Sequence, residues 1–298
     1  MTFAQWFEQY HNAYCVDVIA YDKQRDYYYI NKKHFHPIAD MELQDIKPID
    51  IQSCMKTTAG YSSDRQRSAY FLLKKVFDEA IANGYADINP VSRIKAPKRI
   101  KTYAECFDPT AISSLFDCDT KLSRMFEFDL WTGLRRGELL ALTWENINIE
   151  QKLIYVRQSI IKTKGGDIIQ HTTKSRRDRV VPLSDRALDI LRRIFQNDTQ
   201  SGFVFTSSDG DFISLRNYNR LYKKFFEERQ KACPDLQYLS PHKLRHTYAT
   251  FMLHSGADLE TLRALLGHVD ISTTQRYVHS NMSQMRLATQ KLTFSYSI

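Results

Sequence analysis

Cysteine is scarce in this sequence and shows no pattern of paired sites. The 298 residues include five cysteines, an odd number, and no two of them form a C-x-x-C motif. This pattern argues against a disulfide framework or a cysteine-bound metal cluster, and it favours a reducing compartment. The first ten residues, MTFAQWFEQY, also lack the basic start and apolar core of a signal peptide. We therefore expect a cytoplasmic protein.

Long apolar runs, internal repeats and low-complexity segments are also missing from the sequence. Without a long apolar run no membrane-spanning helix is expected, so we expect no membrane partner. No cluster of aspartate and glutamate indicates a two-metal site, so we expect neither a metal nor a cofactor. What the sequence does have is an excess of basic residues, with a net charge of +8 at pH 7. This excess permits a polyanionic partner.

The first hundred residues show helical apolar spacing without the alternation typical of a strand. The clearest stretch is residues 62–82, where Tyr70, Leu73 and Phe77 form an apolar stripe. We therefore predict a small all-helical domain over residues 1–96. Basic side chains that lie off the stripe belong either to a solvated helix face or to contacts with phosphates. These candidates are Arg65, Arg67 and Lys74.

A short basic segment, IKAPKRIK, follows this domain and is interrupted by proline. Such a composition predicts a linker between two domains, which we place at residues 97–103. Its basic side chains are further candidates for phosphate contacts: Lys98 and Arg99.

The remaining two hundred residues mix helical and strand-like patterns. Residues 153–161, 167–172 and 179–183 are short stretches rich in β-branched residues, which predicts a small antiparallel sheet. Around them, apolar residues recur at helical spacing. The expected fold is therefore mainly α with a small antiparallel β-sheet.

Histidine and arginine recur near the ends of the helices predicted after residue 240. One helix begins at Pro241, and its His242 and Arg245 would project from one edge because they are three positions apart. A second short helix ends at Gly267, and His268 follows it directly. Each feature alone has an ordinary structural explanation, because a histidine near a helix end is usually a surface or hydrogen-bonded residue.

A tyrosine follows in the same region. Ser272 and Gln275 form an S-x-x-Q capping box, which predicts a third short helix with Tyr277 on it. A lone tyrosine usually serves in packing. Of the other tyrosines nearby, Tyr248 lies on an apolar stripe, and Tyr296 lies near the end of the sequence without a helix to position it.

Two motifs upstream combine charged residues. In TGLRRGEL, Arg135 and Glu138 are three positions apart, so the carboxylate can orient the guanidinium or form a simple ion pair. In TTKSRRDRVVPL, Lys174 lies in a basic connection before the last predicted strand, where a lysine alone would normally be solvated. The neighbouring arginines are interpreted as contacts to a phosphate backbone: Arg176, Arg177 and Arg179.

In this order, the motifs resemble the active site of the tyrosine recombinase family, the phage-integrase-like DNA strand-transfer enzymes. The resemblance covers essentially the whole chain and is most specific over residues 132–278. The family's spacing selects Arg135 rather than Arg136 in TGLRRGELLALTW, and its β-hairpin lysine matches Lys174. The resemblance implies six catalytic residues: Arg135, Lys174, His242, Arg245, His268 and Tyr277.

The resemblance also implies a role for each residue. Tyr277 would attack a phosphodiester, giving a 3′-phosphotyrosyl link and a free 5′-hydroxyl. Arg135 and Arg245 would hold the phosphate oxygens. Glu138 would contact the arginines and not the phosphate. Lys174 would protonate the departing 5′-oxygen. His242 would support proton transfer at the tyrosine, and His268 would form a hydrogen bond with the phosphate.

The resemblance further implies an organisation and partners. A helical core-binding domain of the SAM-like type would cover residues 1–96, followed by the linker at 97–103 and a mixed α+β catalytic domain at 104–298. The expected partners are double-stranded DNA recombination sites and further copies of the chain, which would form a homotetramer on DNA. Accessory DNA-bending or directionality proteins are left open.

The expected function is that of a site-specific DNA recombinase that integrates or excises a mobile element or prophage. One alternative is a recombinase that resolves chromosome dimers or plasmids. Another is a DNA-binding relative that kept the fold and lost catalysis, against which the six intact residues argue. A third is an enzyme like the type IB topoisomerases, but the GLRRGEL and LGH motifs favour a recombinase.

Overall fold

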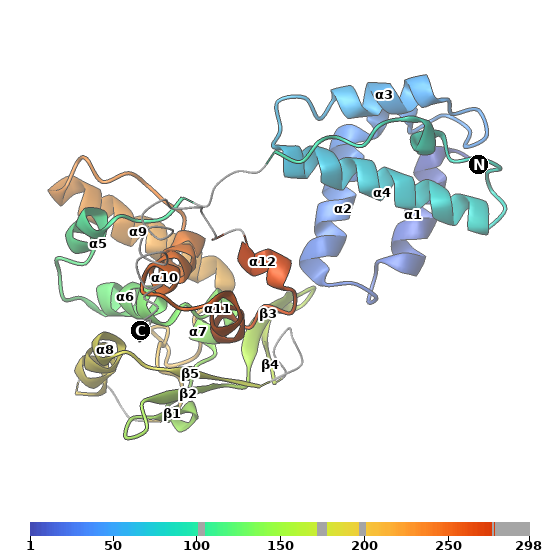
Figure 1. Ribbon diagram of the computed structural model, residues 1–298. Helices are drawn as coiled ribbons and strands as arrows, with labels where there is room; N and C mark the ends of the chain where they lie inside the picture. The colour runs from blue at the N-terminus through green and yellow to red at the C-terminus, as the bar shows by residue number, and fades with distance from the viewer. Residues whose placement is uncertain (101–104, 172–177, 197–200, 276, 278–298) are drawn as a thin grey trace, which may run out of the picture. The chain divides into compact units, whose positions relative to one another are not determined.

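The structure, a computed structural model, describes residues 1–100, 105–171, 178–196, 201–275 and 277. These residues divide into two compact units, one built from the first hundred residues and the other from nearly all of the remainder (Figure 1). The fold class expected from the sequence is confirmed, because the described chain is mainly helical with small antiparallel sheets. Within the described ranges, no helix combines the length and the apolar character needed to cross a bilayer.

The first unit is helical throughout its described residues. Its elements are α1 (Phe3–Tyr14), α2 (Tyr21–His34), η1 (His36–Ile38), α3 (Pro48–Lys56), α4 (Ser63–Ala82) and η2 (Pro90–Arg93). A capping box at Thr2 and Gln5 opens α1. Aromatic side chains form the core, where the Phe3 ring lies 5.8 Å from that of Phe77 on α4. The stripe expected on α4 is buried, as its periodicity predicts.

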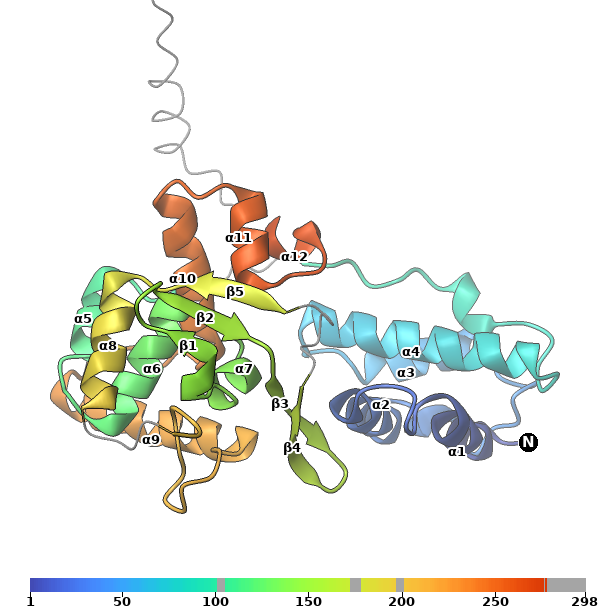
Figure 2. The same ribbon diagram turned by 90° about the horizontal axis from the view of Figure 1, so that it is seen from below.

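Two separate small sheets, rather than one, are formed by strands between residues 147 and 182 (Figure 2). The first contains β1 (Ile147–Asn148), β2 (Leu153–Val156) and β5 (Arg179–Pro182), in the antiparallel order β1-β2-β5. The second pairs β3 (Ser159–Thr163) with β4 (Gly166–Gln170). The expectation of a continuous strand over 153–161 is therefore corrected. The strand breaks before Ser159, where the Gln158 side chain turns away and donates to the Ala141 carbonyl.

Helices form most of the second unit around the central helix α6 (Lys121–Thr132). The helix α6 packs against three others, α8 (Asp185–Phe195), α9 (Leu215–Ala232) and α10 (His242–His254). Its Phe126 ring contacts three aromatic rings of α9 at 4.9 to 5.4 Å. The smaller elements are α5 (Pro109–Leu115), α7 (Arg136–Leu140), η3 (Trp144–Asn146), α11 (Leu259–Leu266) and α12 (Ile271–Gln275).

A close approach of α6 and α10 positions the functional residues. Gly133 ends α6 with a φ of +60°, and a Cβ there would lie 2.3 Å from the Tyr248 ring on α10. Only glycine permits both this conformation and this approach. The contact places Arg135, the residue just before α7, beside the helix that carries Arg245. Next to them, α11 packs against α10, α12 and β5.

Candidate active site

Glu138 is the buried acid at the centre of the site. Arg135 precedes α7 and donates to both carboxylate oxygens, from its backbone N to Oε2 and from Nη1 to Oε1, each at 2.8 Å. Burial alone would raise the pKa of Glu138. The hydrogen bonds and charge of Arg179 outweigh this effect, and with the charges of Arg135 and Arg245 they lower the pKa to about 2. Glu138 is therefore ionised at neutral pH and binds the arginines around it.

Arg179 is a partner of Glu138 in the structure, whereas from the sequence alone it is interpreted as a contact to the DNA backbone. Its Nη1 and Nη2 donate to the two oxygens of Glu138, both at 2.7 Å. Its Nε donates to the Leu265 carbonyl at 3.1 Å, and its side chain is 10% exposed. The sequence places Arg179 in a run of basic residues, and nothing in that run shows that it begins β5 facing a buried carboxylate.

Arg245 is the most deeply buried arginine of the site, at 4% exposure. Its Nη1 donates to the Gly133 carbonyl and its Nη2 to the Leu266 carbonyl, both at 2.6 Å. Burial and the charge of Arg135 lower its pKa to about 10, partly opposed by Glu138. Arg245 therefore remains charged at neutral pH, and it presents a poorly solvated positive charge that an anion can neutralise.

The end of α11 binds all three arginines. The consecutive carbonyls of Leu265, Leu266 and Gly267 accept hydrogen bonds from Arg179, Arg245 and Arg135 respectively. The last carbonyls of a helix have no partner within it and lie at the negative end of its dipole. Here the arginine side chains donate hydrogen bonds to these carbonyls, and their positive charge interacts favourably with the negative end of the dipole. Gly267 permits the turn because it adopts a φ of +64°.

His268 and Tyr277 lie beside Arg245. Arg245 Nη2 lies 3.2 Å from His268 Nε2, and a guanidinium can only donate. Nε2 is therefore the accepting nitrogen, and Nδ1 carries the proton that bonds Thr274 Oγ1 at 2.9 Å. The Tyr277 ring stacks on His268 with centroids 6.4 Å apart and an angle of 9° between the planes.

His246 is a site residue that the sequence interpretation missed. Its ring lies 5.2 Å from that of Tyr277 and 4.5 Å from that of His242, so it connects the two. The signal was present, because His242 and His246 are four positions apart on one helix and must share a face. The structure thus brings together five of the six expected catalytic residues. The sixth, Lys174, lies outside the described residues.

The surroundings of Tyr277 differ from the expected capped helix. The helix α12 ends at Gln275, so Tyr277 lies just beyond it. The expected capping box at Ser272 is not formed; instead the Asp270 carboxylate accepts from the Ser272 backbone N at 2.8 Å. Aspartate is as good a capping residue as serine, and it shifts the start of the helix. The Tyr277 ring is 4% exposed, held by packing and by its backbone N bonding Thr274 O at 3.0 Å.

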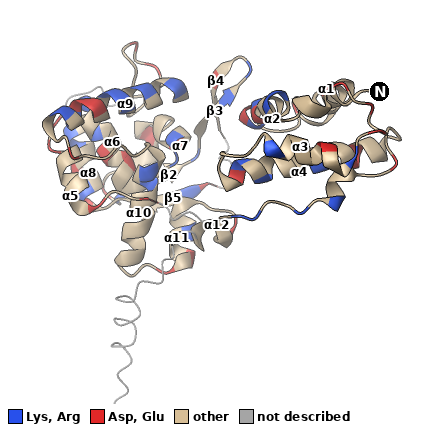
Figure 3. Cartoon of the chain, turned by 90° about the horizontal axis from the view of Figure 1, so that it is seen from above, with Lys and Arg blue, Asp and Glu red and all other residues tan. Residues whose placement is uncertain are grey.

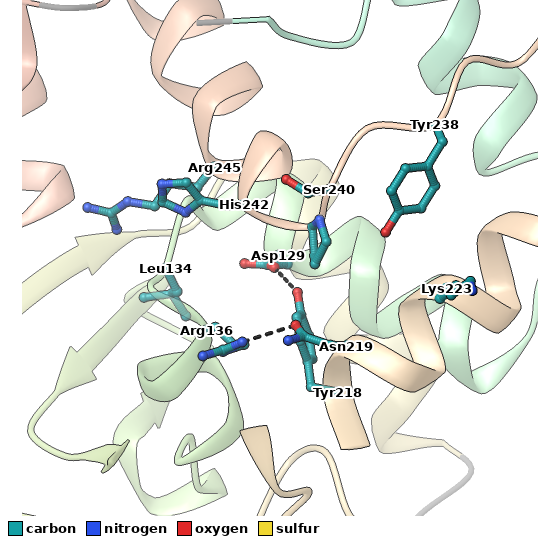
Figure 4. Close-up of a pocket in the computed structure, with 11 residues that line it drawn as sticks. Asp129, Leu134, Arg136, Tyr218, Asn219, Lys223, Tyr238, Ser240, His242 and Arg245 are labelled. Carbon is teal, nitrogen blue, oxygen red and sulfur yellow. Dashed lines mark hydrogen bonds between the residues drawn. The ribbon is translucent and has the colours of Figure 1, made fainter. Parts of the chain in front are cut away.

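A pocket of about 560 Å³ opens beside His242 and Arg245 (Figure 4). Basic side chains, Arg136 and Lys223, line it together with Asn219. At its base the Tyr218 hydroxyl donates to the Asp129 carboxylate. Burial raises the pKa of Asp129 to about 7, although the Tyr218 hydrogen bond opposes the shift.

The other expected DNA-contact residues lie mostly in the first unit, where Figure 3 shows Lys and Arg on α4 and in the segment after η2. Arg65 pairs with Asp26 at 2.6 Å, Arg67 donates to the Pro97 carbonyl at 2.7 Å and Lys74 pairs with Asp78 at 2.9 Å. Lys98 and Arg99 are exposed. Their contact with DNA stays a prediction, and Arg176 and Arg177 lie outside the described residues.

Positive charge at this site comes from arginine. Among the side chains that the structure describes, no group of three His, Cys, Asp or Glu residues could hold a metal ion. Arginines around one point, with histidines and a tyrosine beside them, form a site suited to a phosphate diester. Fold and site together define a class of protein, a helical phosphoryl-transfer enzyme with an arginine-rich centre.

Comparison with known proteins identifies the family. The family model described as phage integrase family matches residues 109–284. A XerC-like tyrosine recombinase of Caldanaerobacter subterraneus subsp. tengcongensis is 30% identical over 286 residues, covering 85% of this chain and 72% of that protein. XerD of Pasteurella multocida is 29% identical over 252 residues, 80% of each chain. The chain belongs to the phage integrase family, whose members are DNA strand-transferring tyrosine recombinases.

Solved structures share this fold. The Tn1549 transposon integrase bound to transposon right end DNA matches with a TM-score of 0.83 at 18% identity, over 98% of this chain and 99% of that one. A lambda integrase dimer bound to a COC′ core site matches with a TM-score of 0.71 at 20% identity, over 93% and 95%. Both likenesses concern the fold.

Proposed function

We propose that this protein is a site-specific DNA recombinase that cuts and rejoins DNA through a 3′-phosphotyrosyl intermediate. The observation that carries the proposal is the stacking of Tyr277 on His268, whose Nε2 accepts from the guanidinium of Arg245. A nucleophile, a hydrogen-bonding group and a phosphate-binding cation thus lie next to one another. An attacking phenol needs this proximity, because a covalent reaction depends on a fixed approach to the phosphorus.

The arginines would stabilise the charge that develops during the transfer. Arg135 and Arg245 can donate to the non-bridging oxygens of the pentacoordinate phosphate, and burial makes these bonds stronger than they would be in water. His242 and His246 lie where they can take part in removing the phenolic proton. Lys174 would protonate the departing 5′-oxygen. Because the Tyr277 ring is buried, binding of DNA must bring its hydroxyl within reach of the phosphate.

The proposed organisation follows the two units. The first unit would be the core-binding domain and the second the catalytic domain, joined by the linker at residues 97–103. We propose that the protein assembles as a homotetramer on two duplexes. A solved lambda integrase tetramer bound to a Holliday junction shares this fold with a TM-score of 0.68. Accessory DNA-bending proteins would be further partners.

Integration or excision of a mobile element is the biology we propose. A plasmid carrying two copies of the DNA junction that flanks the gene, incubated with the protein in excess EDTA, should lose or invert the segment between them. Cleavage should need no divalent ion, because arginines supply the positive charge. DNA binding without any rearranged or covalently bound product would support the non-catalytic alternative instead.

A second candidate function is the resolution of chromosome dimers, as in the Xer recombinases. The relatives named XerC and XerD, at 29–30% identity, favour it. The two candidates differ in their DNA. A resolving enzyme would recombine a site of the host chromosome far from any element, whereas an integrase would recombine only the borders of the element that carries its gene.

A further inference from the structure

Arg179 contacts two parts of the site at once. Its two terminal nitrogens bind Glu138, and its Nε binds the Leu265 carbonyl at the end of α11. Arg179 is also the first residue of β5 and follows Lys174 by five positions. One guanidinium therefore connects three elements: the strand after the Lys174 segment, the α7 carboxylate and the α11 carbonyls.

Glu138 receives the same number of hydrogen bonds from Arg179 and Arg135. Each carboxylate oxygen accepts one bond from Arg179 and one from Arg135, through the Arg135 side chain at Oε1 and its backbone at Oε2. A carboxylate has about four lone-pair positions in its plane, so these four bonds fill it. Arg135 therefore has a fixed position on Glu138 only while Arg179 holds the other side.

Arg179 and Arg135 share a second partner, the end of α11. Arg179, Arg245 and Arg135 bind three successive carbonyls, so the separation of the two proposed phosphate-binding arginines is set by the helix end. Arg179 differs from the other two because both its terminal nitrogens donate to one carboxylate, that of Glu138. The terminal nitrogens of Arg135 and Arg245 are instead divided between two different groups.

We propose that Arg179 is a positioning residue for strand transfer, which fixes Arg135 through Glu138 and joins β5 to the end of α11. This inference rests on the proposed function. Arg179 does not touch the DNA. It sets the distance between the groups that do, and a displacement of about 1 Å in such groups can lower a rate about 100-fold.

Loss of Arg179 should also change the dependence of the reaction on pH. The charged groups that act on Glu138 are Arg135 on the α7 side, Arg179 on β5 and Arg245 on α10, and Glu138 in turn acts on Asp129 of α6. Without Arg179, burial would raise the pKa of Glu138, and a protonated Glu138 could no longer hold Arg135. Cleavage should then weaken at the acidic end of the profile.

The experiment measures single-turnover formation of the covalent protein–DNA adduct on a nicked substrate, from about pH 5 to pH 9. The DNA concentration saturates the protein, so that the rate does not depend on affinity. Arg179→Gln should form the adduct about 10- to 100-fold more slowly, with an acidic limb at higher pH than in the wild type, while DNA affinity is retained. Arg179→Lys should keep the wild-type limb but recover the rate only in part, because lysine has the charge without the fork.

Arg124→Gln is the matched control. Arg124 also donates a fork to a carboxylate, that of Asp119, at 2.7 and 2.8 Å, but away from the site. Arg124→Gln should leave both the rate of adduct formation and its pH profile unchanged. An Arg179→Gln variant with the rate and pH profile of the wild type would overturn the inference. A wild type that forms no adduct at any pH would instead contradict the proposed function.

A double variant tests whether Arg179 acts through Glu138. Glu138→Gln places an uncharged amide at the centre of the site, so Arg179 has no carboxylate to hold. If Arg179 acts through Glu138, Glu138→Gln with Arg179→Gln should be no slower than the slower single variant. Additive losses would contradict the inference.

If Arg179→Gln fails to fold, the inference is tested instead by a carbon-13 NMR titration of the Glu138 carboxyl in Arg179→Lys. A pKa equal to that of the wild type with a fully restored rate would show that the fork is not needed.

Discussion

At the scale of single residues, the site depends on buried charges that neutralise one another. Glu138 is the common partner of Arg135 and Arg179, and it stays ionised because these bonds outweigh the effect of burial. The sequence could identify Arg135 and Glu138, because both lie in a recognisable motif. It could not identify the role of Arg179, since an arginine in a basic run has the same local pattern whether it faces solvent or a buried carboxylate.

Asp129 allows a test of buried charge that does not depend on catalysis. Its folded pKa is raised to about 7, so between about pH 4 and pH 7 the folded state binds a proton that the unfolded state has lost. Stability must therefore fall as pH rises through this window, by up to about 1.4 kcal/mol per pH unit. Asp129→Asn should remove this fall while keeping an acceptor for the Tyr218 hydroxyl.

The measurement is urea unfolding of both proteins across the window. Tyr218→Phe is the matched variant, because it removes the hydrogen bond that opposes the shift and should extend the fall to higher pH. If Asp129→Asn and the wild type lost stability in parallel, Asp129 would be ionised in the folded state at these pH values.

At the scale of elements, the ends of helices carry the site. Gly133 ends α6 and Gly267 ends α11, both with positive φ, and their carbonyls accept from Arg245 and Arg135. The sequence predicted the end of α11, because glycine is a reliable stop signal. It could not predict that arginines distant in the chain bind the carbonyls there. The start of α12 at Ile271 was also missed, since Asp270 competes with Ser272 as the capping residue.

Gly267→Ala should disturb the arginines directly. A Cβ at this position would lie 3.0 Å from Arg179 Cδ and Nη1, so the Arg179 side chain that binds Glu138 must shift. The left-handed backbone adds about 1 to 2 kcal/mol of strain. We expect adduct formation to slow and the pH profile to acquire the acidic limb expected for Arg179→Gln.

Gly256→Ala separates strain from contact. Gly256 follows α10 with a φ of +93°, and a Cβ there would have no atom within 4 Å. It should lower the melting temperature while leaving the pH profile of adduct formation as in the wild type. Equal effects of the two variants on that profile would mean that backbone strain, and not displacement of Arg179, is responsible.

At the scale of the whole molecule, the chain combines two compact units with a net charge of +8. The helical character of the first unit followed from its apolar spacing, and the small strands of the second from their β-branched residues. The division into two sheets did not, because the hydrogen bond to Ala141 from the side chain of Gln158, which lies between β2 and β3, is a tertiary contact. Nor could spacing show that most candidate basic residues of α4 already have partners in the protein.

Lys98 and Arg99 are exposed candidates in the segment of the first unit that follows η2. This segment is held against α4, where Ser63 Oγ accepts from the Ile100 backbone N at 3.2 Å and Arg67 donates to the Pro97 carbonyl. Replacing both residues with glutamine should lower the slope of log affinity against log salt by about 0.9 for each DNA phosphate that is no longer neutralised. The measurement is fluorescence anisotropy on duplex DNA between about 50 and 200 mM salt.

Arg192→Gln provides the control for net charge. Arg192 lies on α8, pairs with Asp189 and has a side chain that is 59% exposed. Its removal should leave the slope unaltered. If the Lys98 and Arg99 variant also kept the wild-type slope, these two side chains would not bind the phosphate backbone.

The central claim is that Tyr277 is the nucleophile, and trapping the covalent intermediate tests it most directly. A nicked substrate that carries the recombination site loses the fragment needed for religation, so the adduct accumulates and can be resolved on a denaturing gel. The wild type should give a covalent protein–DNA band, and Tyr277→Phe should give none while retaining its fold and DNA affinity. Tyr238→Phe, which changes an exposed tyrosine that lines the same pocket as His242, should still form the band. An adduct that persists in Tyr277→Phe, or that maps by peptide sequencing to another residue, would contradict the account.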